Sequence, residues 1–282
     1  MRFRRGAELD PSQVSDRRGM RAGPMVAGGG GLVGLVFLVV SLLTGGQEGS
    51  VGDPFSIGQG GEELAAECRT GEDANQREDC RIVGVINSVQ EFWGKTLENY
   101  RPAQTVFFTE AVNTGCGTAS SQVGPFYCPA DQKVYIDLGF YEDLRQRFGA
   151  QGGPFAEAYV IAHEYGHHVE NLQGILERER SGATGPQSPA VRTELMADCL
   201  AGMWAGGAVE TGFIEELTDA DIADGLDAAA AIGDDRIQEK AQGRVEPESW
   251  THGSSEARQK WFKNGYGGES LQDCDTFAVS NV

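Results

Sequence analysis

The chain has 282 residues and a formal net charge of −19 at pH 7, so it is long enough for one large domain with appended segments. The charge is uneven, because residues 1–24 hold six arginines against three acidic residues and the rest of the chain is strongly acidic. A chain this acidic, with no broad basic patch, lacks the positive surface that binds a phosphate backbone. The composition therefore excludes nucleic acid as an expected partner.

The amino-terminal part of the sequence predicts a membrane anchor. Residues 1–24 are polar and arginine-rich, and we expect them to form a disordered cytoplasmic arm. Residues 25–43 contain no charge over 19 positions, which is enough to cross a bilayer and more than a typical signal peptide has. Because arginines precede this segment and acidic residues follow it, residues 25–44 are expected to be an uncleaved single-pass anchor. Cleavage among the small residues at 41–46 is the alternative.

The remaining chain is expected to lie outside the cytoplasm as a flexible linker at 45–61 and a folded domain at 62–282. The expected elements are helices at 78–97, 140–148, 154–177 and 218–241, a helix from 189 through Trp204, strands at 105–108 and 133–137, and a loop at 113–124. Because the strands are few and short, the predicted fold class is α+β and mainly helical.

Six cysteines all lie after residue 60, and an even number beyond a membrane segment is typical of an oxidising compartment. Fifteen pairings are possible for six cysteines. We favour the two pairs that close short loops and obtain the third by elimination: Cys68–Cys80, Cys116–Cys128 and Cys199–Cys274. Free buried thiols are the alternative. The absence of a CxxC motif indicates neither a zinc ribbon nor a thioredoxin-like site.

Residues 163–167 have the sequence His-Glu-Tyr-Gly-His, which is the HExxH pattern. Two histidines four residues apart on a helix lie on one face, so both imidazoles can bind one Zn²⁺ ion at about 2.0–2.1 Å. Glu164 can take a proton from a zinc-bound water, because zinc lowers the pKa of that water towards about 7. The pattern predicts His163 and His167 as ligands, Glu164 as general base, and hydrolysis, most often of a peptide bond. A chance match is the alternative.

A catalytic zinc usually takes three protein ligands and keeps one position for water. Metzincins have glycine and histidine where this chain has Glu170 and Gln173, so that class is excluded. Glu194 lies on the next predicted helix, with room for a turn between antiparallel helices, and is the predicted third ligand. Asp198 lies on the same face, where it can accept the remaining N–H of a ligand histidine. A solvated acidic face is the alternative for both residues.

Two histidines lie outside this ligand set. His168 is turned by about a hundred degrees from His167 around the helix, so we expect it to pack or to form hydrogen bonds. His252 is the candidate donor to the oxyanion of a tetrahedral intermediate. Tyr135 and Tyr165 are rival donors, and an ordinary surface role is the alternative for His252.

Several segments together resemble the family of bacterial neutral zinc metallopeptidases. They are HEYGHHV at 163–169, ELMADC at 194–199, CGTASSQVGPFYCPADQKVYIDLGFY at 116–141, HGSSEARQKWFKNGY at 252–266 and VSDRRG at 14–19. The resemblance covers nearly the whole chain and implies a peptidase. The Glu-x-x-x-Asp arrangement also resembles gluzincins, which implies a zincin-like fold with Glu194 as ligand. The HGSSEAR segment resembles an HP-containing motif of membrane-associated gluzincins, with Gly253 in place of its proline.

The sequence therefore predicts a membrane-anchored zinc metallopeptidase that faces outward and acts on a peptide or protein. The strand at 133–137 alternates in character shortly before the motif helix, so we expect it to border the cleft and pair with an extended peptide. A non-catalytic envelope scaffold and a hydrolase of cell-wall peptides are the alternatives. Glu164 argues against the scaffold, because binding alone needs no general base. No oligomeric state is predicted.

Overall fold

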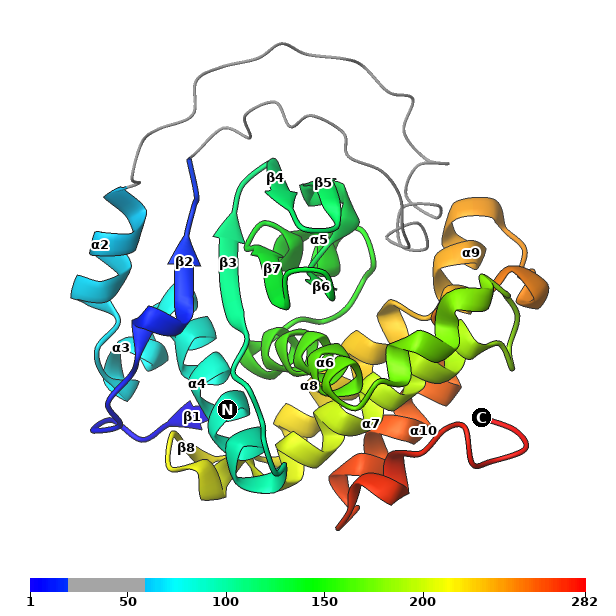
Figure 1. Ribbon diagram of the computed structural model, residues 1–282. Helices are drawn as coiled ribbons and strands as arrows, with labels where there is room; N and C mark the ends of the chain where they lie inside the picture. The colour runs from blue at the N-terminus through cyan, green and yellow to red at the C-terminus, as the bar shows by residue number, and fades with distance from the viewer. Residues whose placement is uncertain (20–58) are drawn as a thin grey trace.

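The structure is a computed structural model that describes residues 1–19 and 59–282 (Figure 1). In these residues the strands are β1 (Arg2–Phe3), β2 (Val14–Asp16), β3 (Gln104–Phe108), β4 (Ala111–Thr114), β5 (Gly117–Ser120), β6 (Phe126–Cys128), β7 (Lys133–Asp137) and β8 (Ile214–Glu216). The α-helices are α2 (Gln59–Glu67), α3 (Gly71–Gln76), α4 (Glu78–Thr96), α5 (Phe140–Gln146), α6 (Pro154–Leu172), α7 (Pro189–Gly207), α8 (Asp219–Ala231), α9 (Asp234–Gln242) and α10 (Ser255–Tyr266). Short 3-10 helices are η1 (Pro11–Gln13), η2 (Ser121–Val123), η3 (Ile175–Ser181), η4 (Ala208–Thr211), η5 (Pro247–Ser249) and η6 (Leu271–Cys274). The predicted class, α+β with helices predominating, is confirmed.

The expected anchor at 25–44 lies outside the described residues, as does most of the expected linker at 45–61. The last residues of that linker belong to α2. Among the residues that the structure describes, no helix is both long enough and apolar enough to span a membrane.

The largest sheet has the strand order β2–β3–β7–β6. The first three strands are parallel, and β6 runs antiparallel to β7 with Phe126 opposite Tyr135 and Cys128 opposite Lys133. The expectation that the strand at 133–137 pairs with an extended peptide is therefore wrong, because β3 and β6 occupy both of its edges. The short connection at 129–132 folds β6 back against the outer side of β7, so β6 is the edge strand.

The first residues of the chain belong to the folded domain. β1 pairs with β8, and β2 pairs with β3, so residues 1–19 contribute to two sheets. The Phe3 side chain is 1% exposed and packs so closely on Gly84 of α4 that a Cβ there would lie 2.6 Å from the ring. The expectation of a disordered arm is wrong for residues 1–19, because Phe3 and Val14 bury apolar surface against the domain.

The helix α6 lies between the sheet above it and α7, α8 and α10 below it (Figure 1). It begins at Pro154 as predicted but ends at Leu172, because Gly174 adopts a left-handed φ of 71° and η3 follows. The helix expected at 218–241 is interrupted at Gly233, where a Cβ would lie 2.5 Å from the Ser255 nitrogen. The other predicted helices and both predicted strands are present with small shifts of their ends.

The three predicted disulfides are all present, and no cysteine in the described residues is free. Cys68–Cys80 joins the end of α2 to α4, and Cys199–Cys274 joins α7 to η6. The segment expected as a loop at 113–124 contains most of the β4–β5 hairpin, and Cys116–Cys128 ties the turn of this hairpin to β6.

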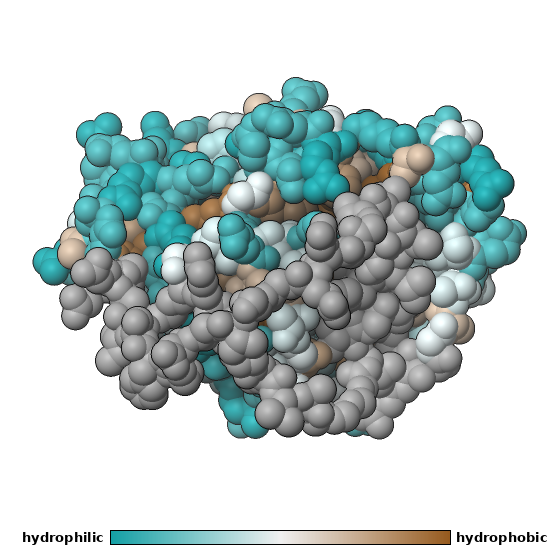
Figure 2. Space-filling model, turned by 90° about the horizontal axis from the view of Figure 1, so that it is seen from above, coloured by the Kyte–Doolittle hydropathy of each residue, from teal (hydrophilic) through white to brown (hydrophobic). Residues whose placement is uncertain are grey.

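Apolar side chains fill both faces of the sheet. The main core lies between the sheet and the helices, and a second cluster on the other face is formed by Val106, Phe108, Val112, Ala119, Phe126, Cys128 and Tyr135. Seen from above, the molecule carries a hollowed band of apolar residues that is bordered by hydrophilic residues (Figure 2).

Candidate metal centre

The predicted metal ligands come together between α6 and α7. The Nε2 atom of His163 lies 3.2 Å from one carboxylate oxygen of Glu194, and the Nε2 atom of His167 lies 3.6 Å from the other. One donor atom from each of the three residues lies within 4.8 Å of the other two. Gly166 allows this close approach of the helices, because a Cβ there would lie 2.9 Å from the Ala197 backbone.

This donor set fits a zinc ion. Three donors at about 2.0–2.1 Å from a tetrahedral centre are separated by roughly 3.3 Å, close to the two distances found here. Two imidazoles and one carboxylate are also the ligand type of a catalytic zinc with an open fourth position. The side chains of His163, His167 and Glu194 are only 8%, 14% and 16% exposed, so little movement is needed for all three to bind one ion.

His163 is oriented by a buried ionic cluster behind it. Its Nδ1 atom lies 2.9 Å from the Asp198 carboxylate, as predicted. Arg258 of α10 holds that carboxylate with two hydrogen bonds, donated from Nε at 2.8 Å and from Nη2 at 3.0 Å. Tyr159 also donates to Asp198. Burial favours the neutral carboxyl, but Arg258 and His163 outweigh burial and hold the pKa of Asp198 below its usual value.

His167 has a comparable partner on its own helix. Its Nδ1 atom lies 2.8 Å from Oε2 of Glu170, whose side chain is fully buried. A carboxylate at this position fixes the ring so that Nε2 faces Glu194. Glu170 also distinguishes this chain from metzincins, and its i+3 spacing from His167 is the sequence signal for this contact.

Glu164 follows His163 on α6 and is buried. It is 7% exposed, and burial raises the pKa of its carboxyl above the ordinary value. The charges of His163 and His167 act in the opposite direction and lower that pKa. A carboxylate with a raised pKa is a better proton acceptor near neutral pH.

His252 is half-buried and near enough to Glu194 for their charges to interact, and Asp234 holds it in place. Asp234 accepts backbone hydrogen bonds from Thr251, His252 and Gly253 at 2.7–2.9 Å, and its other oxygen lies 3.2 Å from Nδ1 of His252. The Nδ1 atom of His252 is thus engaged by Asp234 and by the Thr251 hydroxyl. Burial alone would lower the pKa of His252, but Glu194 and Asp234 raise it and so favour the form that donates a hydrogen bond.

The rival oxyanion donors lie elsewhere. The Tyr135 hydroxyl donates to Asp131 at 2.6 Å, and its ring belongs to the outer apolar cluster. The Tyr165 hydroxyl lies 2.9 Å from Oγ1 of Thr105 on β3. His168 forms hydrogen bonds away from the centre, as expected.

Sequence reasoning missed Asp234, Glu170 and Arg258, and Arg258 was visible only as the last residue of the HGSSEAR segment.

The structure thus brings both histidines of the HExxH pattern together with Glu194 of the neighbouring helix. The chain belongs to the family described as "Putative neutral zinc metallopeptidase", whose model matches residues 1–277. An uncharacterized protein of Mycobacterium tuberculosis is 51% identical over 224 residues, which is 77% of this chain and 76% of that protein. The uncharacterized protein YpfJ of Escherichia coli K12 is 39% identical over 300 aligned residues, covering 99% of this chain and all of that protein. No solved structure matches the chain.

Proposed function

We propose that this protein is a zinc-dependent peptidase that hydrolyses peptide bonds at the α6–α7 centre. The observation that carries the proposal is the convergence of His163, His167 and Glu194 on one point beside the buried Glu164. Each of the two histidines is also held by a buried carboxylate, which is typical of metal ligands.

His163, His167 and Glu194 would hold a zinc ion, which would supply a Lewis acid for the scissile carbonyl and make water more acidic. Glu164 takes the proton from the attacking water and passes it to the leaving nitrogen. His252, oriented by Asp234, donates a hydrogen bond to the oxyanion that forms at the carbonyl carbon. Asp198 and Arg258 keep the His163 ring in place while charge develops in front of it.

The free edge of β6 is the substrate path that the sheet supports best. Within residues 1–19 and 59–282, β6 pairs only with β7, and it packs against α6, which carries the HExxH motif. An extended peptide added along this edge would form main-chain hydrogen bonds with β6 and place a scissile bond near the centre.

We also propose that the chain is attached to a membrane through residues 25–44 and that its domain, together with the strands β1 and β2 that pair with it, lies outside the cytoplasm. The uncharged segment at 25–43 and the three disulfides support this placement.

The proposal is tested by comparing wild type with Glu164→Gln, which keeps the shape of the side chain and removes its basic oxygen. We expect an unchanged zinc content, near-normal thermal stability, and turnover that falls by about a hundredfold or more. His252→Ala should lower turnover by a smaller factor, because water can partly replace its donor. The measurements are hydrolysis of a quenched peptide library and zinc content of each variant.

Three other results would contradict part of the proposed function. Equal activity of wild type and Glu164→Gln would exclude Glu164 as the base. Zinc-loaded wild type that cleaves no peptide would favour the scaffold. Cleavage of cell-wall peptides alone would favour an enzyme of the cell wall. Glu194→Ala should lose most of its zinc, and a full equivalent in that variant would exclude Glu194 as a ligand.

A further inference from the structure

A buried polar joint connects the motif helix α6 to the edge strand β6. The Tyr127 side chain faces α6 from β6, whereas the flanking Phe126 and Cys128 belong to the apolar cluster on the opposite face of the sheet. The Tyr127 hydroxyl lies 3.0 Å from Nδ1 of His168 and 2.9 Å from Nδ2 of Asn171, and both of these residues are on α6. None of these three side chains lies among the proposed metal ligands.

Only one assignment of donors and acceptors satisfies the hydrogen bonds of this joint. His168 Nε2 lies 2.6 Å from the carbonyl oxygen of Arg101, and a carbonyl can only accept, so Nε2 carries the proton. In the neutral ring, Nδ1 must then accept a hydrogen bond from the Tyr127 hydroxyl, and the hydroxyl oxygen accepts one from Asn171. His168 therefore ties α6 both to β6 and to the segment that leads into β3.

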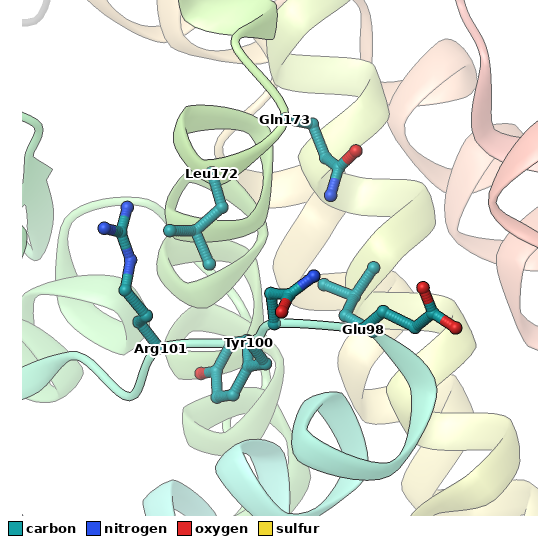
Figure 3. A pocket seen from close by; sticks show the side chains of 7 residues that line it. Glu98, Tyr100, Arg101, Leu172 and Gln173 are labelled. Atoms are coloured by element: carbon teal, nitrogen blue, oxygen red, sulfur yellow. The ribbon is translucent and has the colours of Figure 1, made fainter.

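A cavity next to this joint makes its polar contacts more important. The cavity has a volume of about 360 Å³ and is lined by Leu97, Glu98, Asn99, Tyr100, Arg101, Leu172 and Gln173. Figure 3 shows Leu172 and Gln173 at the end of α6 on one side of this space, and Glu98 and Tyr100 on the other. The cavity leaves part of the interface between α6 and residues 97–101 unfilled. Side-chain packing alone therefore holds α6 less firmly against these residues.

We propose that His168, together with Tyr127 and Asn171, is a positioning residue that fixes the edge strand β6 relative to α6 and thereby sets the affinity for an extended peptide. The inference rests on the proposed function, because it assigns the free edge of β6 to substrate. A peptide bound along β6 reaches the centre on α6 only if strand and helix keep a constant separation. A shift of about 1 Å between them is enough to weaken productive binding.

The test measures peptide affinity in the full-length, zinc-loaded Glu164→Gln protein, in which binding is observed without turnover. The probe is a fluorescent ten-residue peptide that the wild type cleaves, and its binding is followed by anisotropy. Adding Tyr127→Phe, which removes one hydroxyl and keeps the ring, should weaken binding by about tenfold. The matched control is Tyr165→Phe, which removes a hydroxyl that ties α6 to the inner strand β3, and binding should stay within about twofold.

Two variants of His168 separate positioning from a general structural role. His168→Asn keeps an acceptor near the Nδ1 position for Tyr127, whereas His168→Gln keeps a donor near the Nε2 position for Arg101. If the link to β6 sets the affinity, His168→Asn should bind the peptide more tightly than His168→Gln. Equal affinity of these two variants, or equal losses in Tyr127→Phe and Tyr165→Phe, would exclude the proposal.

Hydrogen exchange of the β6 amides gives a readout that does not depend on catalysis. Tyr127→Phe should increase exchange in β6 by about tenfold and leave β3 unchanged, and Tyr165→Phe should not affect β6. If the wild type cleaves no peptide, the proposed function fails. If exchange of the β6 amides still increases in Tyr127→Phe, the joint is nevertheless confirmed as the contact that holds β6 against α6. Unchanged exchange in β6 would exclude the joint itself.

Discussion

His163 lies between two carboxylates, with Asp198 at its Nδ1 atom and Glu194 at its Nε2 atom. Burial alone would lower the pKa of this histidine, but the two carboxylates outweigh burial and raise the pKa to about 10. Before zinc binds, the ring is therefore protonated at neutral pH. Because zinc needs the lone pair of Nε2, binding must release that proton.

This charge state predicts a pH-dependent zinc affinity. At pH 8, zinc binding to the wild type should release about one proton more than binding to Asp198→Asn, because the substitution removes one of the carboxylates that hold the proton. Calorimetry in buffers of different ionisation enthalpy measures this difference, and equal proton release from both proteins would contradict it. Since the folded-state pKa lies above the unfolded value of about 6.5, the ion pairs stabilise the zinc-free domain below that pH. That stability should be lost as the pH rises through about 10.

The sequence was informative about the candidate site where its residues are linked by helical spacing. His163 and His167 repeat at i+4, and so do Glu194 and Asp198, so their shared faces could be predicted. Arg258 and Asp234 could not be found in this way, because they reach the site from other elements through contacts 60 and 18 residues apart in the chain. Their roles depend on the packing of α10 and on the turn after α8, which no local pattern specifies.

At the scale of elements, the contact between α7 and α10 brings Arg258 to Asp198. The two helices are in backbone contact: a Cβ at Gly265 would lie 1.8 Å from the Cys199 carbonyl oxygen, and a Cβ at Gly202 would lie 2.0 Å from that of Phe262. Any side chain at these two glycines must push the helices apart. The glycines therefore determine how deeply α10 carries Arg258 into the site.

Gly265→Ala should consequently destabilise the domain by roughly 2–3 kcal/mol and weaken zinc binding, because Arg258 would move away from Asp198. The melting temperature should fall by about 5–10 °C. The control is Gly94→Ala in α4, where a Cβ meets nothing within 4 Å, and alanine there should stabilise the helix by up to about 1 kcal/mol. If Gly265→Ala has the same melting temperature and zinc affinity as the control, the close contact between α7 and α10 does not determine the position of Arg258 at the site.

Elements with a regular spacing of apolar residues were predicted from the sequence. Strands that pair with residues far away along the chain were not. The helices α4, α6 and α7 show helical spacing or caps in the sequence, and the structure contains all three. β1 and β2 are two and three residues long, and their partners lie 90 or more residues away along the chain. Such short strands carry no alternating pattern, so the composition of this arginine-rich segment predicts disorder instead.

At the scale of the whole molecule, the pairing of residues 1–19 conflicts with the expected membrane topology. β2 extends the same sheet whose opposite edge is β6, and β1 pairs with β8 near the end of α7. These pairings make residues 1–19 and the rest of the described chain one folded unit. The uncharged stretch at 25–43 is long enough for one crossing, and a single crossing would place residue 19 and residue 59 on opposite sides.

We expect the amino-terminal segment and the domain to share one compartment, because separating them would expose the buried Phe3 and Val14 and break two strand pairings. The test uses Gly6→Cys and Ser280→Cys, which place single thiols at exposed positions in the two parts of the chain. In intact cells, a membrane-impermeant maleimide should label both variants or neither, and after detergent lysis it should label both. Labelling of Ser280→Cys alone would instead show the single-pass arrangement that the arginine distribution predicts. In that arrangement residues 1–19 would be absent from the sheet of the membrane-bound protein, and β3 would be left as its free edge.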